Sequence, residues 1–192
     1  MSTVVMHNVV SVDGFIADDS DDVGPLFDWY FNGDTEITDG FGKVTRTSAE
    51  YVRPMWDSIG AMVIGRHLFD MTNGWEGKPP AGEHVVVVSR RPRPDGWHPE
   101  ASYFFTADVA GAIAQAKELA GPDQIVAVAA GNVGGQALAQ GLVDEVAMDV
   151  VPVVFGSGKR YFGSVEAQHL LEDPEVVIQG KGVLHLRYRV RR

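Results

Sequence analysis

Short runs of apolar, mostly β-branched residues recur along this chain, and each is too short to be a typical helix. They span residues 4–12, 61–64, 84–88 and 124–129, and the run at 84–88 holds four consecutive valines after a histidine. Valine-rich runs that end at turn residues are typical of strands buried on both faces of a sheet. The sequence therefore predicts a mainly parallel sheet covered by helices.

Helical patterns alternate with these predicted strands. The four residues from Thr47 to Glu50 form a capping box that predicts a helix through about residue 58. The alanine-rich stretch 107–120 has apolar side chains at helical spacing and ends at Gly121, and a shorter helix is expected over residues 135–140. This alternation predicts a single α/β domain over residues 1–192, a three-layer α/β/α sandwich.

The carboxyl-terminal segment has a different pattern, with a period of two. Residues 175–179 and 183–190 flank Gly180-Lys181-Gly182, which is a hairpin turn signal. In the second run, apolar residues alternate with His185, Arg187 and Arg189. This predicts an antiparallel strand at the sheet edge with a solvated cationic face, and it brings the predicted strands to about eight.

Composition narrows the class of protein. With 192 residues, 45% of them apolar and 22% charged, the chain has the make-up of one globular domain. Its net charge of −10 repels nucleic-acid phosphates and anionic lipids, so neither is an expected partner. The chain has no cysteine, which excludes disulfides and thiolate chemistry. With no signal peptide and no apolar run long enough to span a membrane, a cytoplasmic protein is expected.

The sequence contains incomplete versions of several well-known motifs. Gly156-Ser157-Gly158-Lys159 ends like a phosphate-binding loop. However, Val153 stands where that motif needs its first glycine, and Arg160 stands where it needs serine or threonine. The acidic run 18–22 lacks the glycine and terminal glutamate of a calcium loop, and the histidines lack zinc-site spacing. No metal is therefore expected. The absence of a Gly-x-Ser-x-Gly elbow argues against a serine hydrolase.

Three segments that directly follow buried strands carry groups suited to an anion. They are Gly65-Arg66-His67-Leu68, Ser89-Arg90-Arg91 and the glycine-rich stretch 131–138. Each alone is equally explained as an ordinary surface turn. Together they place hydroxyl, guanidinium and backbone N–H donors at strand ends, where ligands of open α/β sheets bind. A dinucleotide with an extra phosphate, NADPH, would use all three.

Three further stretches complete a resemblance to a known superfamily. Ser11-Val12-Asp13-Gly14-Phe15-Ile16-Ala17, the stretch 141–145 and the stretch 152–158, taken with the three turns, resemble the dihydrofolate reductase-like superfamily. Within it, the chain is similar to the reductase domain of the deaminase–reductases of riboflavin biosynthesis. The resemblance covers nearly the whole chain and implies an NADPH-dependent reductase with a mixed eight-stranded sheet and an antiparallel C-terminal hairpin.

The resemblance also implies residue roles on the cofactor side. Arg66, helped by Ser89 and Arg90, would hold the adenosine 2′-phosphate, and Thr106 would touch the adenosine end. Ile16 and Ala17 would face the nicotinamide. The remaining residues would surround the pyrophosphate: Gly65, His67 and Leu68 on one side, and Gly131, Asn132, Val133, Gly134 and Gly135 on the other.

The substrate side departs from the family pattern. Ala129 stands where riboflavin-pathway reductases carry a substrate-contacting glutamate, and an insert over about residues 18–45 is expected to form a mobile lid. Asp13 is the candidate acid or substrate anchor, with an ordinary Asp-Gly turn as the alternative. Asp28, beside Trp29, matches loosely the early acidic residue of dihydrofolate reductases. Trp29 and Phe155 are candidate pocket walls, or alternatively core.

The sequence thus favours an NADPH-dependent reductase of a small heterocycle, such as a pteridine or an aminopyrimidine. Two alternatives stay open: the 5-amino-6-(5-phosphoribosylamino)uracil reductase step of riboflavin biosynthesis, and a non-catalytic NADP-binding protein. A homodimer is also expected, because residues 146–155 form a long apolar stretch that needs cover. In the competing account, the C-terminal hairpin covers that stretch within one chain.

Overall fold

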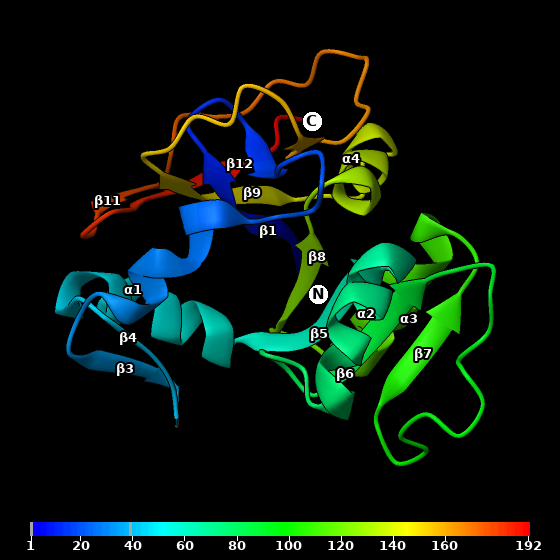
Figure 1. Cartoon of the computed structure of the whole chain (residues 1–192). Helices are drawn as coiled ribbons and strands as arrows, with labels where there is room; N and C mark the ends of the chain where they lie inside the picture. Colours follow the sequence, from blue (N-terminus) through cyan, green and yellow to red (C-terminus); the bar gives the residue numbers. More distant parts are fainter. Residues whose placement is uncertain (1, 39) are drawn as a thin grey trace.

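The computed structural model describes residues 2–38 and 40–192; Asp39, in the expected lid segment, lies outside them. In this part of the chain, eight strands form one mixed sheet with helices on both sides, in the order β11-β12-β9-β1-β8-β5-β6-β7 (Figure 1). This confirms the predicted fold class. The strands are β1 (Thr3–Ser11), β5 (Ile59–Gly65), β6 (His84–Val88), β7 (Tyr103–Thr106), β8 (Ile125–Ala129), β9 (Glu145–Val151), β11 (Val176–Gln179) and β12 (Leu184–Arg189).

The six strands from β9 to β7 are mutually parallel, and in the C-terminal hairpin β12 runs antiparallel both to β9 and to β11. The edge strand is β11, so the expectation that the second hairpin strand lies at the edge is wrong. Nor is the polar face of β12 fully solvated: His185 is fully buried and Arg187 is half-buried. The reason is that β12 lies between β11 and β9, and helix α1 (Arg46–Asp57) packs against the hairpin.

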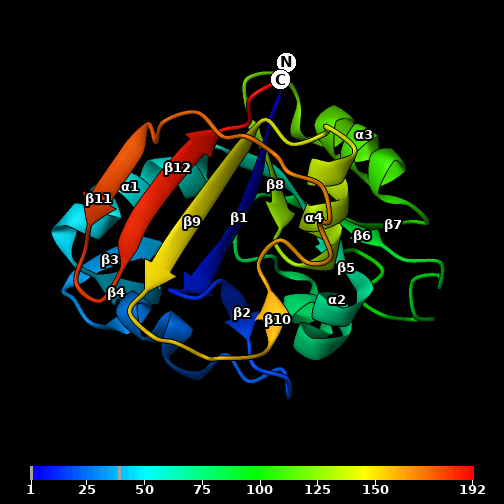
Figure 2. The same ribbon diagram turned by 90° about the horizontal axis from the view of Figure 1, so that it is seen from above.

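Helices cover the two faces of the sheet unequally. On one face, α3 (Val109–Ala120) and α4 (Asn132–Ala139) pack against the middle strands. On the other, α1 and the 3₁₀ helix η1 (Gly24–Phe31) cover β1, β9 and β12, while α2 (Arg66–Thr72) and η2 (Asn73–Gly77) cover β5 to β7. Figure 2 looks onto the first face, where β9, β12 and β11 have no helix over them.

The segment expected to be a mobile lid is instead an integral part of the fold. It contains η1 and a small antiparallel sheet of β3 (Thr35–Thr38) and β4 (Phe41–Val44). Its apolar side chains join the core under α1, where they pack with Val9 of β1 and Val151 of β9. They are Leu26, Trp29, Tyr30, Ile37 and Val44, each at most 4% exposed.

Two helix starts differ from the sequence prediction. Thr45, not Thr47, caps α1, and its hydroxyl accepts a hydrogen bond from the backbone N–H of Ser48. Helix α4 begins at Asn132, three residues before the predicted start. Both predictions placed the boundary by local propensity, whereas the strand ends fix where each helix begins.

A last, short ribbon pairs β2 (Phe15–Ala17) with β10 (Lys159–Arg160). It holds the loop after β1 against the loop after β9. Across residues 2–38 and 40–192, no helix has the length and apolar character needed to cross a membrane.

Candidate active site

Most of the predicted site residues lie in loops at one edge of the sheet, because the carboxyl ends of six parallel strands meet there. The strands end at Val151, Ser11, Ala129, Gly65, Val88 and Thr106, in spatial order from β9 to β7. Ligands of open α/β sheets bind in the crevice outside these ends. The loops that leave this edge are therefore the candidate site.

The loop after β1 is a tight turn tied to the loop after β9. Gly14 has a φ of +89° and donates to the Ser11 carbonyl at 3.0 Å. The carboxylate of Asp13 accepts from the Ser11 hydroxyl at 2.6 Å and from the backbone N–H groups of Phe155 and Gly156, at 3.2 and 2.7 Å. Asp13 thus joins the two loops that flank the end of β1.

These contacts bear on the expected role of Asp13. The Ser11 hydroxyl, followed by the N–H groups of Gly156 and Phe155, lowers the pKa of this exposed carboxyl below its ordinary value. An ionised carboxylate accepts hydrogen bonds and has no proton to give. The geometry therefore disfavours Asp13 as the acid, and its role as a substrate anchor stays a prediction.

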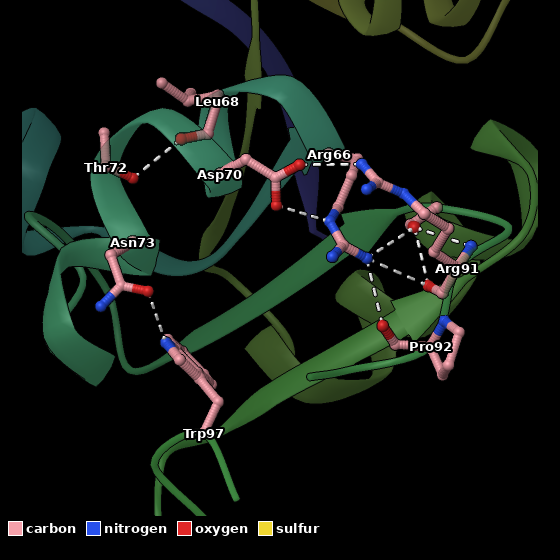
Figure 3. A network of polar contacts seen from close by, with 9 residues as sticks. Arg66, Leu68, Asp70, Thr72, Asn73, Arg91, Pro92 and Trp97 are labelled. Carbon is pink, nitrogen blue, oxygen red and sulfur yellow. Dashed lines mark hydrogen bonds and ion pairs between the residues drawn. The ribbon is translucent and has the colours of Figure 1, made fainter. Parts of the chain in front are cut away.

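Arg66 opens α2 and is fixed by a network of polar contacts (Figure 3). Its Nε donates to Asp70 at 2.7 Å, and its Nη1 donates to the Ser89 hydroxyl at 3.3 Å and to the Pro92 carbonyl at 3.1 Å. The side chain is only 16% exposed. Arg66 and Ser89 thus lie side by side, as a shared role at one phosphate would require. No protein hydrogen bond to the Nη2 donors is found in the described parts of the chain.

Arg91, not Arg90, joins this network. The Arg91 guanidinium bridges to Asp70 at 2.8 Å, and Ser89 Oγ accepts from the Arg91 backbone N–H at 3.0 Å. Hydrogen bonds from Arg66 and Arg91 hold the pKa of Asp70 below its ordinary value. Arg90 is exposed, and its side chain makes no hydrogen bond within the described residues. Sequence order could not tell which of two adjacent arginines turns toward Arg66.

The glycine-rich turn before α4 lies against the Gly65 turn and the β2 ribbon, and Arg66 links the Gly65 turn to Ser89. Gly131 has a φ of +85°, and its N–H donates to the Tyr161 carbonyl at 2.6 Å. A Cβ on Gly131 would lie 3.2 Å from Ile16 Cδ1, and a Cβ on Gly65 would lie 3.2 Å from Val133 Cγ2. The structure therefore brings the three predicted turns side by side.

The next two glycines of this turn face inward. A Cβ on Gly134 would lie 2.8 Å from the Ala129 carbonyl oxygen, and a Cβ on Gly135 would collide with the Phe162 carbonyl oxygen. Close packing alone explains why these two positions are glycine. Asn132 is exposed, so of this stretch it is the side chain most open to a ligand.

The remaining predicted cofactor residues lie around these turns. His67 is exposed, and its Nε2 lies 3.1 Å from Asp21. Leu68 is half-buried, and Ala17 is buried in the β2 ribbon. Thr106 ends β7, and its hydroxyl donates to Gln115 at 2.7 Å.

Of the predicted substrate residues, Trp29 is not a pocket wall. It is 2% exposed and stacks on Tyr30, with ring centroids 4.0 Å apart. Both rings belong to the core between η1 and the sheet. Asp28, the neighbour of Trp29 in η1, is exposed. Phe155 is half-buried, and its ring lies against Gly24, at the start of η1.

Sequence reasoning missed a buried polar cluster beneath α1. Asp149 Oδ2 lies 2.8 Å from His7 Nε2, and Asp149 Oδ1 lies 2.6 Å from His185 Nδ1. The other nitrogen of His185 lies 2.9 Å from the Ser48 hydroxyl. A signal was available, since Asp149 is the one charged residue inside the apolar run 146–155. Its pairing with two histidines was not deducible, because they come from β1 and β12.

Burial alone would raise the pKa of Asp149, but His7 and His185 outweigh it and lower the pKa to about 2. The carboxylate is therefore ionised at neutral pH. Within residues 2–38 and 40–192, no group of three or more histidine, aspartate or glutamate side chains is arranged to hold a metal ion.

The donor set at the carboxyl edge fits a phosphate-bearing dinucleotide. A guanidinium with Nη2 donors left over, beside a serine hydroxyl and a second arginine, matches a phosphate monoester. The Gly131 turn lies in the loop after the neighbouring strand β8, so further phosphates would meet the start of α4 and the exposed Asn132. A cavity of about 490 Å³ opens beside the loop after β1, lined by Asp13, Gly14, Phe15, Leu138, Arg160, Phe162, Gly163, Val165, Ala167, His169 and Leu171.

Comparisons with known proteins agree with this architecture. A family model described as the RibD C-terminal domain matches residues 2–185. A proposed riboflavin biosynthesis protein from Shewanella sp. PV-4 shares the fold, with a TM-score of 0.72 and 21% identity over 100% of both chains.

Two other solved structures share the fold at 15% identity. A pyrimidine reductase-like protein from Corynebacterium diphtheriae has a TM-score of 0.60, with 100% of this chain and 92% of that chain covered. The deaminase/5-amino-6-(5-phosphoribosylamino)uracil reductase of Thermotoga maritima has a TM-score of 0.59, with 99% and 57% covered. A search of the curated proteins gives no match.

Proposed function

The chain belongs to the RibD C-terminal domain family, and from this premise we propose that it is an NADPH-dependent reductase of a small heterocycle. The expected acceptor is a pteridine or an aminopyrimidine. The observation that carries the proposal is the fixed Arg66 guanidinium beside Ser89, in the same row of loops as the Gly131 turn.

Arg66 and Ser89 are proposed to hold the adenosine 2′-phosphate, with Arg91 in the role that was expected of Arg90. Support comes from the Asp70 carboxylate, which holds both guanidinium groups in place and thereby preorganises them. Gly131, Asn132 and Val133 would contact the pyrophosphate, and Ile16, which lies over Gly131, would contact the nicotinamide. When bound, NADPH would supply the hydride.

The acceptor is proposed to lie toward β1 and β9, beyond the nicotinamide end. Asp13 and Phe155 border that part of the edge, and the Asp13 carboxylate keeps their two loops together. A substrate with N–H donors would find an ionised acceptor there. The 5-amino-6-(5-phosphoribosylamino)uracil step remains the second candidate, favoured by family membership.

Turnover tests this proposal. The purified chain is mixed with NADPH and, separately, with dihydrofolate, a dihydropterin and 5-amino-6-(5-phosphoribosylamino)uracil, and the fall in NADPH absorbance is followed. We expect one of these acceptors to give a rate at least tenfold above NADPH alone, and NADH to support it poorly. Tight NADPH binding without turnover on the whole panel would contradict the reductase proposal and favour a non-catalytic NADP-binding protein.

We also propose that the protein is a homodimer through the sheet face that lacks helices. The hairpin covers the edge of β9, as in the competing account, but it leaves one apolar face open. Alternation along the paired strands puts Met148, Val150, Leu184, Leu186 and Val177 on that face, and Val177 is 61% exposed. A second copy of this chain would cover it.

Light scattering at micromolar concentration, with NADPH present, checks this expectation. The mass should be about twice the 20.8 kDa of one chain. Leu186→Arg puts a charge in the centre of the proposed interface and should give a monomer that keeps its fold. A wild-type mass of one chain would rule out the dimer.

A further inference from the structure

The reduction proposed above needs a proton as well as a hydride, and Asp13 is poorly suited to give one. Its carboxylate already accepts three hydrogen bonds from the chain and has a lowered pKa. The reaction requires a group that can carry a proton near neutral pH and that lies toward the carboxyl ends of the parallel strands. Histidine is the side chain whose ordinary pKa suits this task.

His7 has the right place in the fold. It lies on β1, and its register partner is Ala129, the last residue of β8 before the Gly131 turn. Val9, two residues further along the same face of β1, packs in the core under α1, whereas Ala129 packs against the core under α2. His7 thus lies at the boundary between the two cores, and its side chain remains 17% exposed.

One nitrogen of His7 is committed to Asp149. The Asp149 carboxylate is ionised and only accepts hydrogen bonds, so His7 Nε2 carries the proton in their 2.8 Å contact. Nδ1 is therefore the nitrogen left to gain and lose a proton. A ring held through one nitrogen by a buried carboxylate keeps a fixed orientation, as in other paired His–carboxylate sites.

On the side away from His7, Asp149 is fixed by a series of buried polar groups. Asp149, His185 and Ser48 are 2%, 0% and 1% exposed, and their contacts of 2.6 and 2.9 Å run without a break from the β9 carboxylate to α1. The other ionisable groups that feel the Asp149 charge are Tyr30 of η1, Tyr51 of α1 and Tyr161, and the ion pair of Arg187 and Glu145 lies beside Tyr51. The cluster has a single half-open end, at His7.

We propose that His7 is the proton donor of the reduction and that Asp149, with His185 and Ser48 behind it, is its positioning group. This inference rests on the proposed reductase function. In the step, the hydride forms the new C–H bond of the acceptor C=N group, and the proton on His7 Nδ1 moves to the acceptor nitrogen. The C=N bond is thereby reduced by two electrons, the dinucleotide is oxidised, and His7 is left neutral and regains a proton from solvent.

The test compares wild type, His7→Gln, Asp149→Asn and the control His98→Gln, which changes a histidine on a distant surface loop. In His7→Gln, the amide still donates to Asp149, but no titratable proton is left. We expect kcat to fall about 100-fold, while the Kd for NADPH changes less than twofold. The wild-type fall of kcat with rising pH should be absent in this variant. His98→Gln should behave as wild type.

A second readout needs no turnover. The ring ¹⁵N signals of His7 should report the proton fixed on Nε2 in wild type and not fixed there in Asp149→Asn, because the carboxylate that accepts from Nε2 is gone. Should His7→Gln keep its kcat within threefold, or should the His7 ring signals report the same tautomer in both proteins, the inference is wrong while the reductase function stands. A wild type with no turnover on the acceptor panel overturns both.

Discussion

Replacing Asp149 by alanine is expected to lower the free energy of unfolding by about 3–5 kcal/mol. The carboxylate is 2% exposed and lies between His7 and His185, so its removal leaves two imidazoles without their shared partner. Urea unfolding at pH 7 measures the change. Asp95→Ala, at an exposed carboxylate with no hydrogen bond within the described residues, should stay within about 0.5 kcal/mol of wild type.

The same residue gives the stability a dependence on acid. The pKa of Asp149 is about 2 in the folded protein against an ordinary 3.8, so its ionised form stabilises the fold fully above about pH 4. That contribution is lost as the pH falls through 2. Asp149→Asn should flatten this part of the stability profile, and an Asp149→Ala loss below about 1 kcal/mol would contradict the account of the cluster.

The second large effect is expected at Arg66. Arg66→Ala should weaken NADPH binding by about 1.5–3 kcal/mol, the range of a hydrogen bond to a charged group, which is about 10- to 150-fold in Kd. NADH, which lacks the 2′-phosphate, should be nearly unaffected. Titration calorimetry with both dinucleotides measures the two changes in the same preparation.

Two comparisons make the Arg66 result specific. Arg91→Ala should give a smaller loss for NADPH, because Arg91 reaches the network through Asp70. Arg46→Ala, which removes an exposed arginine paired with Glu50 on α1, should change neither Kd. Equal losses for NADPH and NADH in Arg66→Ala would show that Arg66 does not read the 2′-phosphate.

The parts of the fold that the sequence predicted well are those that burial dictates. β6 has the predicted bounds, His84–Val88, because its valines are buried on both faces of the sheet, as the run of four valines predicts. The start of α4 was predicted at Gly135, three residues late, and both Gly134 and Gly135 lie inside the helix. In the fold they are needed where the helix packs against Met6 and the backbone of Phe162.

The errors at the site have a common cause. Contacts between side chains far apart in sequence decide which residues are buried and which are paired. Residues 18–45 look like a polar lid until the half of the sheet they cover is known. His185 looks like one cation of a solvated face until Asp149 of β9 is placed beside it. The turns at Gly65, Ser89 and Gly131 could be predicted, because each depends on one strand end and its own loop.

The proposed function requires the carboxyl edge of the sheet to bind a phosphate-bearing dinucleotide. The most direct measurement is the ¹H–¹⁵N spectrum of the labelled chain as NADPH is added. We expect the largest shift changes at the backbone amides of residues 65–67, 89–91 and 131–133, with much smaller changes at 65–67 and 89–91 for NADH. Changes confined to residues 162–171, beside the cavity near Leu138, or equal changes for both dinucleotides, would contradict the account.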